Sequence, residues 1–168
     1  MKKQKPRHSA TKQAGITIRR AKNTDAARIA ELSGQLGYPT KPAEIARRLR
    51  KIKPPSQHAV FIAESPERKV IGWLHVSAYP LLEVPQRAEV NGLVVDDRER
   101  SHGTGALLLR AAEDWAHSRG CKSMSVRSNI IRERAHQFYL RSGYEHYKTQ
   151  KAFRKPLLTA AEVTGLPS

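Results

Sequence analysis

A strand, a glycine-containing loop and a helix follow one another between residues 87 and 118, and this unit constrains the fold more than any other part of the chain. The run "RAEVNGLVV" is typical of a largely buried strand, and "GALLLRAAEDWAHS" has the periodicity of an amphipathic helix. Between them stands "RSHGTG", residues 100–105, with two glycines one residue apart. Glycine is costly in conformational entropy, so this pair indicates a backbone that another group must approach closely.

Periodicity along the rest of the chain predicts the element order β-α-α-β-β-β-α-β-α-β. No internal repeat and no long linker interrupts it. The expected strands are 16–21, 59–65, 70–81, 87–97, 123–129 and a last extended stretch at 144–157, and the expected helices are 23–37, 41–52, 104–118 and 132–142.

This order predicts a mixed α/β domain with a central sheet, because helices alternate with strands. Antiparallel pairs should dominate the first half and strand-helix-strand crossovers the second. At 168 residues the chain is long enough for one domain with its own core. We expect a disordered basic arm over residues 1–15, the folded domain over 16–158 and a C-terminal tail over 159–168.

Composition excludes several classes of protein. A single cysteine, Cys121, rules out an internal disulfide framework and fits a reducing compartment, so we expect a cytoplasmic location. No run of about 18 apolar residues is present, which predicts no membrane-spanning helix. Cysteine and histidine do not cluster at ligand spacing, so we expect no metal site.

The basic N-terminus contributes much of the net charge of +16. The first 22 residues hold eight Lys and Arg and no acid. Two interpretations stay open: a solubilising tail, or an arm that associates with nucleic acid or another anionic surface. Aromatic residues do not interleave with these charges, so a base-stacking platform is not indicated.

The loop before the third helix has the features of an anion site. The first N–H groups of a helix have no intrahelical acceptor, and the helix dipole is positive there. Gly103 and Gly105 let a phosphate approach the main chain, and Arg98 and Arg100 add charge. The loop lacks the Gly-Lys-Ser/Thr of a P-loop and the third glycine of the dinucleotide fingerprint.

Two motifs carry a family resemblance. "VVDDRERSHGTGALLL" resembles the acetyl-CoA-binding motif of the GNAT (Gcn5-related) N-acetyltransferases, Arg/Gln-x-x-Gly-x-Gly/Ala, filled here by Arg100, Gly103 and Gly105. "RSNIIRERAHQFYLRSGYE" is similar to the later element of that family, an Asn before a helix with Ala-x-x-Phe-Tyr and then Gly-Tyr. The strand and helix order extends the similarity over about residues 16–158.

The resemblance implies a GNAT fold whose fourth and fifth strands splay apart, and acetyl-CoA as co-substrate. The loop amides would grip the CoA pyrophosphate, main-chain groups near Leu93 and Val95 would bind the pantetheine arm, and an amide near Val94 would stabilise the oxyanion. Homodimers are common in the family, so a dimer is the default expectation. The implied cofactor-binding residues are Leu93, Val94, Val95, Arg100, Ser101, His102, Gly103, Thr104, Gly105, Ala106 and Asn129.

The same resemblance supplies two candidate catalytic groups. Tyr139 occupies the position of the general acid, and a phenol is protonated at neutral pH. Glu89 stands four residues before Leu93, and residues two and four apart share one face of a strand, so Glu89 could point toward the cleft as general base. His75 and water remain alternative bases, and Asn129 could equally be a strand-to-helix cap.

The acceptor is the least determined part. Residues 38–53 and 79–86 and the C-terminal stretch should shape its site, and they carry few acids, which weighs against strongly cationic acceptors. We expect transfer of acetyl from acetyl-CoA to a primary amine by direct attack in a ternary complex. Two alternatives are a non-catalytic acyl-CoA sensor, and a nucleic-acid-associated factor that acts through the basic arm.

Overall fold

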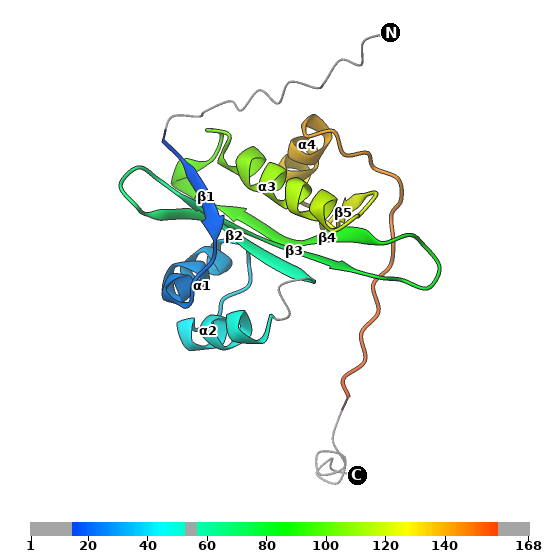
Figure 1. Ribbon diagram of the computed structural model, residues 1–168, viewed down its shortest axis with the longest axis horizontal. Coiled ribbons are helices and arrows are strands. Elements are labelled where there is room, and N and C mark those ends of the chain that lie inside the picture. Colours follow the sequence, from blue (N-terminus) through cyan, green and yellow to red (C-terminus); the bar gives the residue numbers. More distant parts are fainter. Residues whose placement is uncertain (1–14, 53–56, 158–168) are drawn as a thin grey trace.

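Five strands form one sheet in the computed structural model, which describes residues 15–52 and 57–157 (Figure 1). The spatial order is β1-β2-β3-β4-β5, with antiparallel pairing from β1 to β4 and parallel pairing of β5 with β4. In chain order the elements are β1 (Thr17–Arg20), α1 (Ala26–Gln35), α2 (Pro42–Lys51), β2 (His58–Glu64), β3 (Val70–Tyr79), β4 (Arg87–Val95), α3 (Thr104–Ser118), β5 (Met124–Val126) and α4 (Glu133–Arg141).

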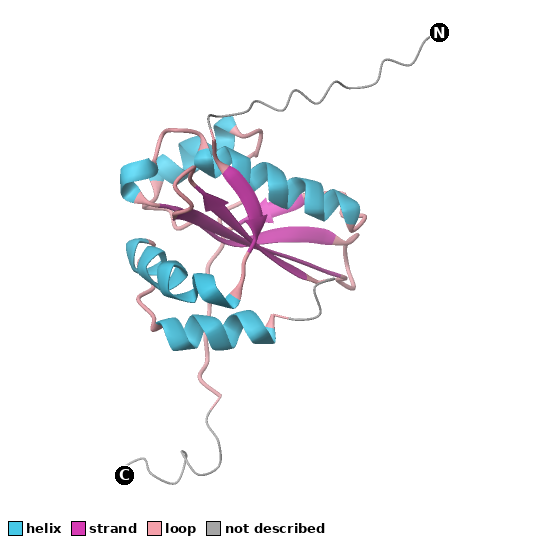
Figure 2. Cartoon of the chain, turned by 60° about the vertical axis from the view of Figure 1, so that its left-hand side comes forward, coloured by secondary structure: helices cyan, strands magenta, loops and turns pink. Residues whose placement is uncertain are grey.

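Helices cover both faces of the sheet, as Figures 1 and 2 show: α1 and α2 lie on one side and α3 on the other. The larger core lies under α3, where Leu108, Leu109 and Ala112 pack on Leu74 and Val76 of β3. A smaller core joins α1 and α2 to the opposite face. Its members are Ala26, Ile29, Ala30, Ile45 and Ile62, with Trp73 packed against them. The mixed, mostly antiparallel sheet flanked by helices confirms the expected fold class.

A β-bulge interrupts β4 at Asn91. Val76 of β3 pairs with Val90, and the preceding His75 pairs with Gly92, so Asn91 has no partner across the ladder. The Asn91 side-chain amide donates to the hydroxyl of Ser77, 2.8 Å away. An extra residue in a strand shifts the alternation of side chains from there onward.

The fourth and fifth strands part after a short contact, as expected. Only Ala88, Glu89 and Val90 of β4 pair with β5. Beyond Val90, the remaining residues of β4 have no partner in β5, so a gap opens between the two strands. This gap sets the position of the candidate active site.

The last predicted strand is wrong. Residues 145–157 form neither helix nor strand, and the segment runs along the outside of the molecule past β4 and β5 (Figure 1). Tyr147, Phe153 and Leu157 on it are exposed. Its composition favours an extended chain, but a strand also needs a hydrogen-bonding neighbour, and this stretch pairs with none in the described ranges. The arm predicted over residues 1–15 and the tail over 159–168 lie outside the described residues, except for Gly15.

Candidate active site

The loop between β4 and α3 presents a row of main-chain donors. Gly103 has φ +77°, in the left-handed region that glycine adopts readily, and it ends the loop directly before α3. Within the described ranges, the amides of residues 101–105 donate to no protein acceptor. The hydroxyl of Thr104, 1% exposed, also lacks a hydrogen-bond partner there. With the positive end of the helix dipole, these donors suit an anion of the size of pyrophosphate.

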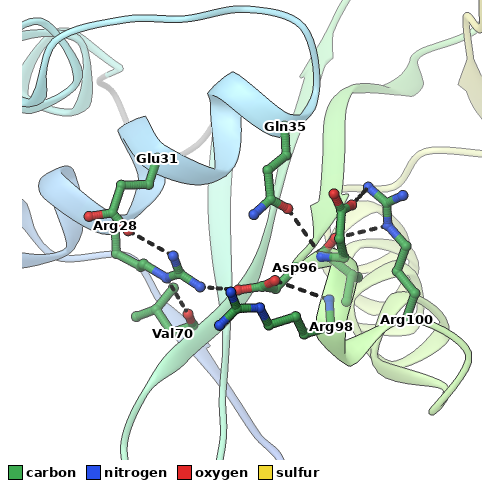
Figure 3. A network of polar contacts seen from close by, with 9 residues as sticks. Arg28, Glu31, Gln35, Val70, Asp96, Arg98 and Arg100 are labelled. Carbon is green, nitrogen blue, oxygen red and sulfur yellow. Dashed lines mark hydrogen bonds and ion pairs between the residues drawn. The ribbon is translucent and has the colours of Figure 1, made fainter.

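A network of polar contacts fixes this loop to α1 (Figure 3). Arg28 forms an ion pair with Asp96, directly after β4, and its Nε donates to the carbonyl of Val70, 3.0 Å away. Gln35, at the end of α1, accepts a hydrogen bond of 3.1 Å from the amide of Asp97. The start of the loop is therefore held by α1 as well as by the sheet.

Arg100 turns back onto the chain that precedes it. Its Nε donates to the Val95 carbonyl over 3.2 Å, and its guanidinium forms an ion pair with Asp97. In this arrangement the Arg100 side chain braces the loop. The Arg100 side chain is thus engaged by protein partners, and the predicted anion site would consist mainly of main-chain groups.

A cavity of about 790 Å³ continues from this loop into the gap between β4 and β5. Its walls come from residues 90–95 of β4, residues 126–129 at and after β5, the loop after α1, and α4. Among the predicted cofactor-binding residues, His102 is exposed and does not line it. Those that do are Leu93, Val94, Val95, Arg100, Ser101, Gly103, Thr104, Gly105, Ala106 and Asn129.

The amide of Val94 points away from the gap, although the resemblance implied that an amide near Val94 stabilises the oxyanion. The amide of Asp96 donates to Ile71 of β3 over 2.8 Å, and N–H groups alternate sides along a strand. The Val94 carbonyl also faces β3, since a methyl group on Gly72 would lie 2.9 Å from it. The amide of Val94 therefore points to β3, and the amides of Leu93 and Val95 point to the gap. Among these three residues, the amides of Leu93 and Val95 are therefore the ones open to a ligand in the gap.

Tyr139 lies on α4 and lines the cavity. Its ring packs against Phe138 and Tyr144, with centroid distances of 5.2 and 5.8 Å. Burial raises the pKa of the Tyr139 hydroxyl, and the positive charge of Arg132 opposes this effect. The phenol is therefore protonated throughout the neutral range, as a proton donor must be. Gly105 permits this packing, because a methyl group there would lie 3.3 Å from the Phe138 ring.

Glu89 lies on the face of the sheet opposite α3, and the inference that it shares a face with Leu93 is wrong. Glu89 pairs with Ser77, whereas Leu93 pairs with Leu74 and packs into the core under α3. The bulge at Asn91 causes this change of face. Glu89 is 7% exposed and is not among the cavity-lining residues.

Two polar groups hold the Glu89 carboxylate at the point where β4 and β5 part. Arg127, the first residue after β5, places its Nε 2.6 Å from Oε1. The hydroxyl of Tyr79 donates to Oε2 over 3.4 Å. The carboxylate is thus fixed at the edge of the cavity, on the side of the sheet that α1 and α2 cover in part.

His75 is a poor base in this fold. Burial, and secondarily the charge of His58, lower its pKa to about 4. The two rings are in contact, with His58 Nδ1 and His75 Nε2 3.2 Å apart. A group with so low a pKa has little affinity for the proton of an ammonium ion.

The lowered pKa of His75 predicts a pH-dependent stability. The unfolded chain, with a histidine pKa of about 6.5, takes up a proton before the folded chain does as the pH falls. The stabilisation from His75 is therefore complete above about pH 6.5 and is lost as the pH falls toward 4. Between pH 7 and pH 5 we expect a loss of about 2 kcal/mol in the free energy of unfolding, measured by urea denaturation.

The variant His75→Gln should show a flatter dependence over the same interval. His117→Gln, at an exposed histidine on α3, is the matched control and should follow the wild-type curve. Equal pH dependence in His75→Gln and the wild type would contradict the assignment.

Asn129 closes a turn that precedes α4, whose N-cap is Arg132. Its side-chain oxygen accepts from the amide of Ile131 over 3.2 Å, and its carbonyl accepts from the amide of Arg132 over 3.0 Å. Its predicted contact with pantetheine stays a prediction. Across residues 15–52 and 57–157, no group of three or more His, Cys, Asp and Glu side chains is arranged to hold a metal ion.

A comparison of the sequence with the profiles of known families agrees with these features of the site. The sequence profile described as the Acetyltransferase (GNAT) family matches residues 24–144. This chain belongs to the GNAT acetyltransferase family. Use of acetyl-CoA is general to that family, and its members transfer the acetyl group to an acceptor.

Relatives of this GNAT protein include characterised N-acetyltransferases. It is 31% identical over 102 residues to aminoglycoside N(6')-acetyltransferase type 1 of Klebsiella aerogenes. The aligned stretch covers 59% of this chain and 67% of the relative. It is 39% identical over 66 residues to the aminoalkylphosphonate N-acetyltransferase of Salmonella typhimurium, spanning 38% of this chain and 43% of the relative. N-acetylation is therefore supported, and these two relatives differ in their acceptors.

Solved structures show the same fold. The aminoglycoside 6'-N-acetyltransferase of Acinetobacter baumannii superposes with a TM-score of 0.74 at 16% identity, over 85% of this chain and 99% of the other. A second neighbour, AAC(6')-Iy in complex with a bisubstrate analogue of CoA, has a TM-score of 0.75 at 19% identity, over 86% of this chain and all of the other. Within the described ranges, no helix of this GNAT protein combines the length and the hydropathy of a membrane span.

Two arginines at the site of this GNAT protein were missed in the sequence. Arg127 follows Val126 in an alternating strand, which predicts its face but not its contact with Glu89, 38 residues earlier in the chain. Arg132 donates to the carbonyl of Leu36 over 2.7 Å and so joins the start of α4 to the loop after α1. Both contacts join segments distant in sequence, and no local pattern marks them.

Proposed function

We propose that this GNAT protein is an N-acetyltransferase that moves the acetyl group of acetyl-CoA to a primary amine by direct attack in a ternary complex. The observation that carries this proposal is that the loop before α3 and the gap between β4 and β5 belong to one continuous cavity. The unpaired amides of residues 101–105 lie at one end of the cavity, and the gap between β4 and β5 forms the rest of it. A diphosphate held at the first feature would leave its attached arm free to enter the second.

The residues present fit acetyl-CoA. The loop amides would bind the pyrophosphate, and Gly103 adopts the left-handed backbone of the turn that carries them. The amides of Leu93 and Val95, which face the gap, would bind the pantetheine arm and the carbonyl oxygen of the acetyl group. Bound acetyl-CoA supplies a thioester, from which an amine can take the acetyl group.

Tyr139 and Glu89 have complementary roles in this proposal. The amine nitrogen forms a bond to the acetyl carbon while the bond from that carbon to sulfur breaks. Tyr139 donates its hydroxyl proton to the departing sulfur, which its raised pKa permits at neutral pH. Glu89 holds the incoming ammonium group and accepts its proton directly or through water, since the low pKa of His75 makes that ring a weak base.

The test combines binding with turnover. Isothermal titration calorimetry should show acetyl-CoA binding, and release of the free CoA thiol should depend on an added primary amine. Mass spectrometry should then find the amine heavier by one acetyl group. Tight acetyl-CoA binding without thiol release for any amine would favour the acyl-CoA sensor instead.

A further inference from the structure

An ion pair between Glu89 and Arg127 stands where β4 and β5 part. Glu89 belongs to the last paired segment of β4, opposite Ser125 of β5, and Arg127 follows directly after β5 ends at Val126. The contact joins Arg127 Nε and Glu89 Oε1 over 2.6 Å. Arg127 also lines the cavity, so the pair lies at its edge.

The pair lies on the opposite face of the sheet from α3. Met124 and Val126 pack into the core under α3, so the alternating Ser125 and Arg127 face the other side, as Glu89 does. The donor loop, by contrast, leads into α3. Arg127 and the loop therefore line the cavity from different faces of the sheet, and the charge of Arg127 lies on the face from which a second ligand could enter beside α1 and α2.

The two partners differ in how firmly they are held. The Glu89 side chain is 9% exposed, and Tyr79 also contacts it, whereas the Arg127 side chain is 79% exposed. Glu89 is thus a fixed carboxylate. Arg127 is an exposed guanidinium that uses its Nε edge for Glu89 and can exchange that partner for another anion, because the planar fork binds carboxylate and phosphoryl groups well.

The charges around the cavity decide which amine fits here. Its lining residues include five arginines and two glutamates: Arg100, Arg127, Arg132, Arg134, Arg141, Glu99 and Glu133. An acceptor that carries only an ammonium group would meet Glu89 beside the guanidinium of Arg127, which repels it. An acceptor with both signs of charge would replace one ion pair by two, because its ammonium would bind Glu89 and its anion would bind Arg127.

We infer that the acceptor is a small primary amine that carries an anionic group, a carboxylate or a phosphoryl group, with Glu89 receiving the ammonium and Arg127 the anion. This inference rests on the proposed acetyl transfer and narrows its acceptor. It makes Arg127 a residue that determines specificity. Glu89 serves every amine.

The experiment compares three amines of similar size by CoA thiol release: 3-aminopropanoate, 2-aminoethylphosphonate and propylamine. We expect kcat/KM for at least one anionic amine to exceed that for propylamine tenfold or more, and the faster of the two identifies the anion. In Arg127→Ala this ratio should fall to near one, chiefly through a higher KM for the anionic amine. Arg110→Ala, which removes the same charge from an exposed position on α3, on the other face of the sheet, is the matched control and should keep the wild-type ratio.

The outcomes distinguish failure of this inference from failure of the proposed function. Equal use of propylamine and the anionic amines would overturn the inference and leave the transferase in place. A preference for the anionic amine that persists in Arg127→Ala would also overturn it. Acetyl-CoA binding without acetylation of any amine, in this panel or a wider one, would remove the transferase proposal and the inference together.

Discussion

Gly103→Asp is expected to weaken acetyl-CoA binding by about 100-fold or more, because it places a carboxylate in the loop whose amides would bind the pyrophosphate. A unit charge about 4 Å from each charge of a diphosphate costs about 1 kcal/mol in water and about 4 kcal/mol at the surface of a protein. Each 1.4 kcal/mol is a factor of ten in the dissociation constant. Isothermal titration calorimetry with acetyl-CoA and with CoA measures the change.

The control for Gly103→Asp separates charge at the site from backbone strain. Gly120, after the end of α3, has φ +76°, nearly the same as the +77° of Gly103. A Cβ on Gly120 meets no described atom within 4 Å, so Gly120→Asp adds the same side chain at the same backbone conformation, away from the loop. We expect a comparable loss of stability in both variants and an unchanged dissociation constant in Gly120→Asp. An unchanged constant in Gly103→Asp would refute the assignment of the loop.

The second large effect is on turnover. Tyr139→Phe should lower kcat at least tenfold, because general acid catalysis by a positioned group contributes roughly 100-fold to 10,000-fold and the phenylalanine ring has no proton to donate. The acetyl-CoA dissociation constant should stay within about twofold, since the ring still packs against Phe138 and Tyr144. Steady-state kinetics and calorimetry on the same preparation provide both values.

A matched control for this variant is Tyr147→Phe. Tyr147 is 66% exposed in the segment after α4 and does not line the cavity. It should turn over at the wild-type rate. Since the pKa of Tyr139 is raised above its ordinary value, kcat of the wild type should also show no loss from deprotonation of this group below about pH 10. Undiminished kcat in Tyr139→Phe would take the acid role away from it.

Most of the fold follows from local patterns in the sequence. Ten elements were expected from the sequence, and nine of them, β1 to β5 and α1 to α4, are present in the structure. Their signals were the alternation of apolar residues in the strands and the 3.6-residue period in the helices. The turn before α3 was also predictable, because two glycines one residue apart between a strand and a helix indicate a tight turn. The expected strand at 144–157 failed because extended composition does not supply a pairing partner.

The parts of the candidate site that the sequence did not predict are those set by long-range contacts. The ion pairs Arg28–Asp96 and Glu89–Arg127 join residues 68 and 38 positions apart, and only the folded chain brings them together. The face of Glu89 was predicted wrongly because alternation was counted across Asn91. The pair Asn91-Gly92 is a signal that could have marked the bulge, because both residue types are disfavoured inside strands and a glycine within a strand pattern often indicates one.

The extra residue Asn91 lies between Glu89 and Leu93, which are four positions apart and yet lie on opposite faces of β4. Upstream of it, the strand presents Glu89 toward the side from which an acceptor would enter. Downstream, Leu93 and Val95 bury their side chains under α3 and leave their amides at the open edge. Removing Asn91 would join Val90 and Gly92 in a regular ladder opposite Val76 and His75, so Glu89, Leu93 and Val95 would keep their faces. Such a deletion would remove only the local twist of the strand and the amide contact to Ser77.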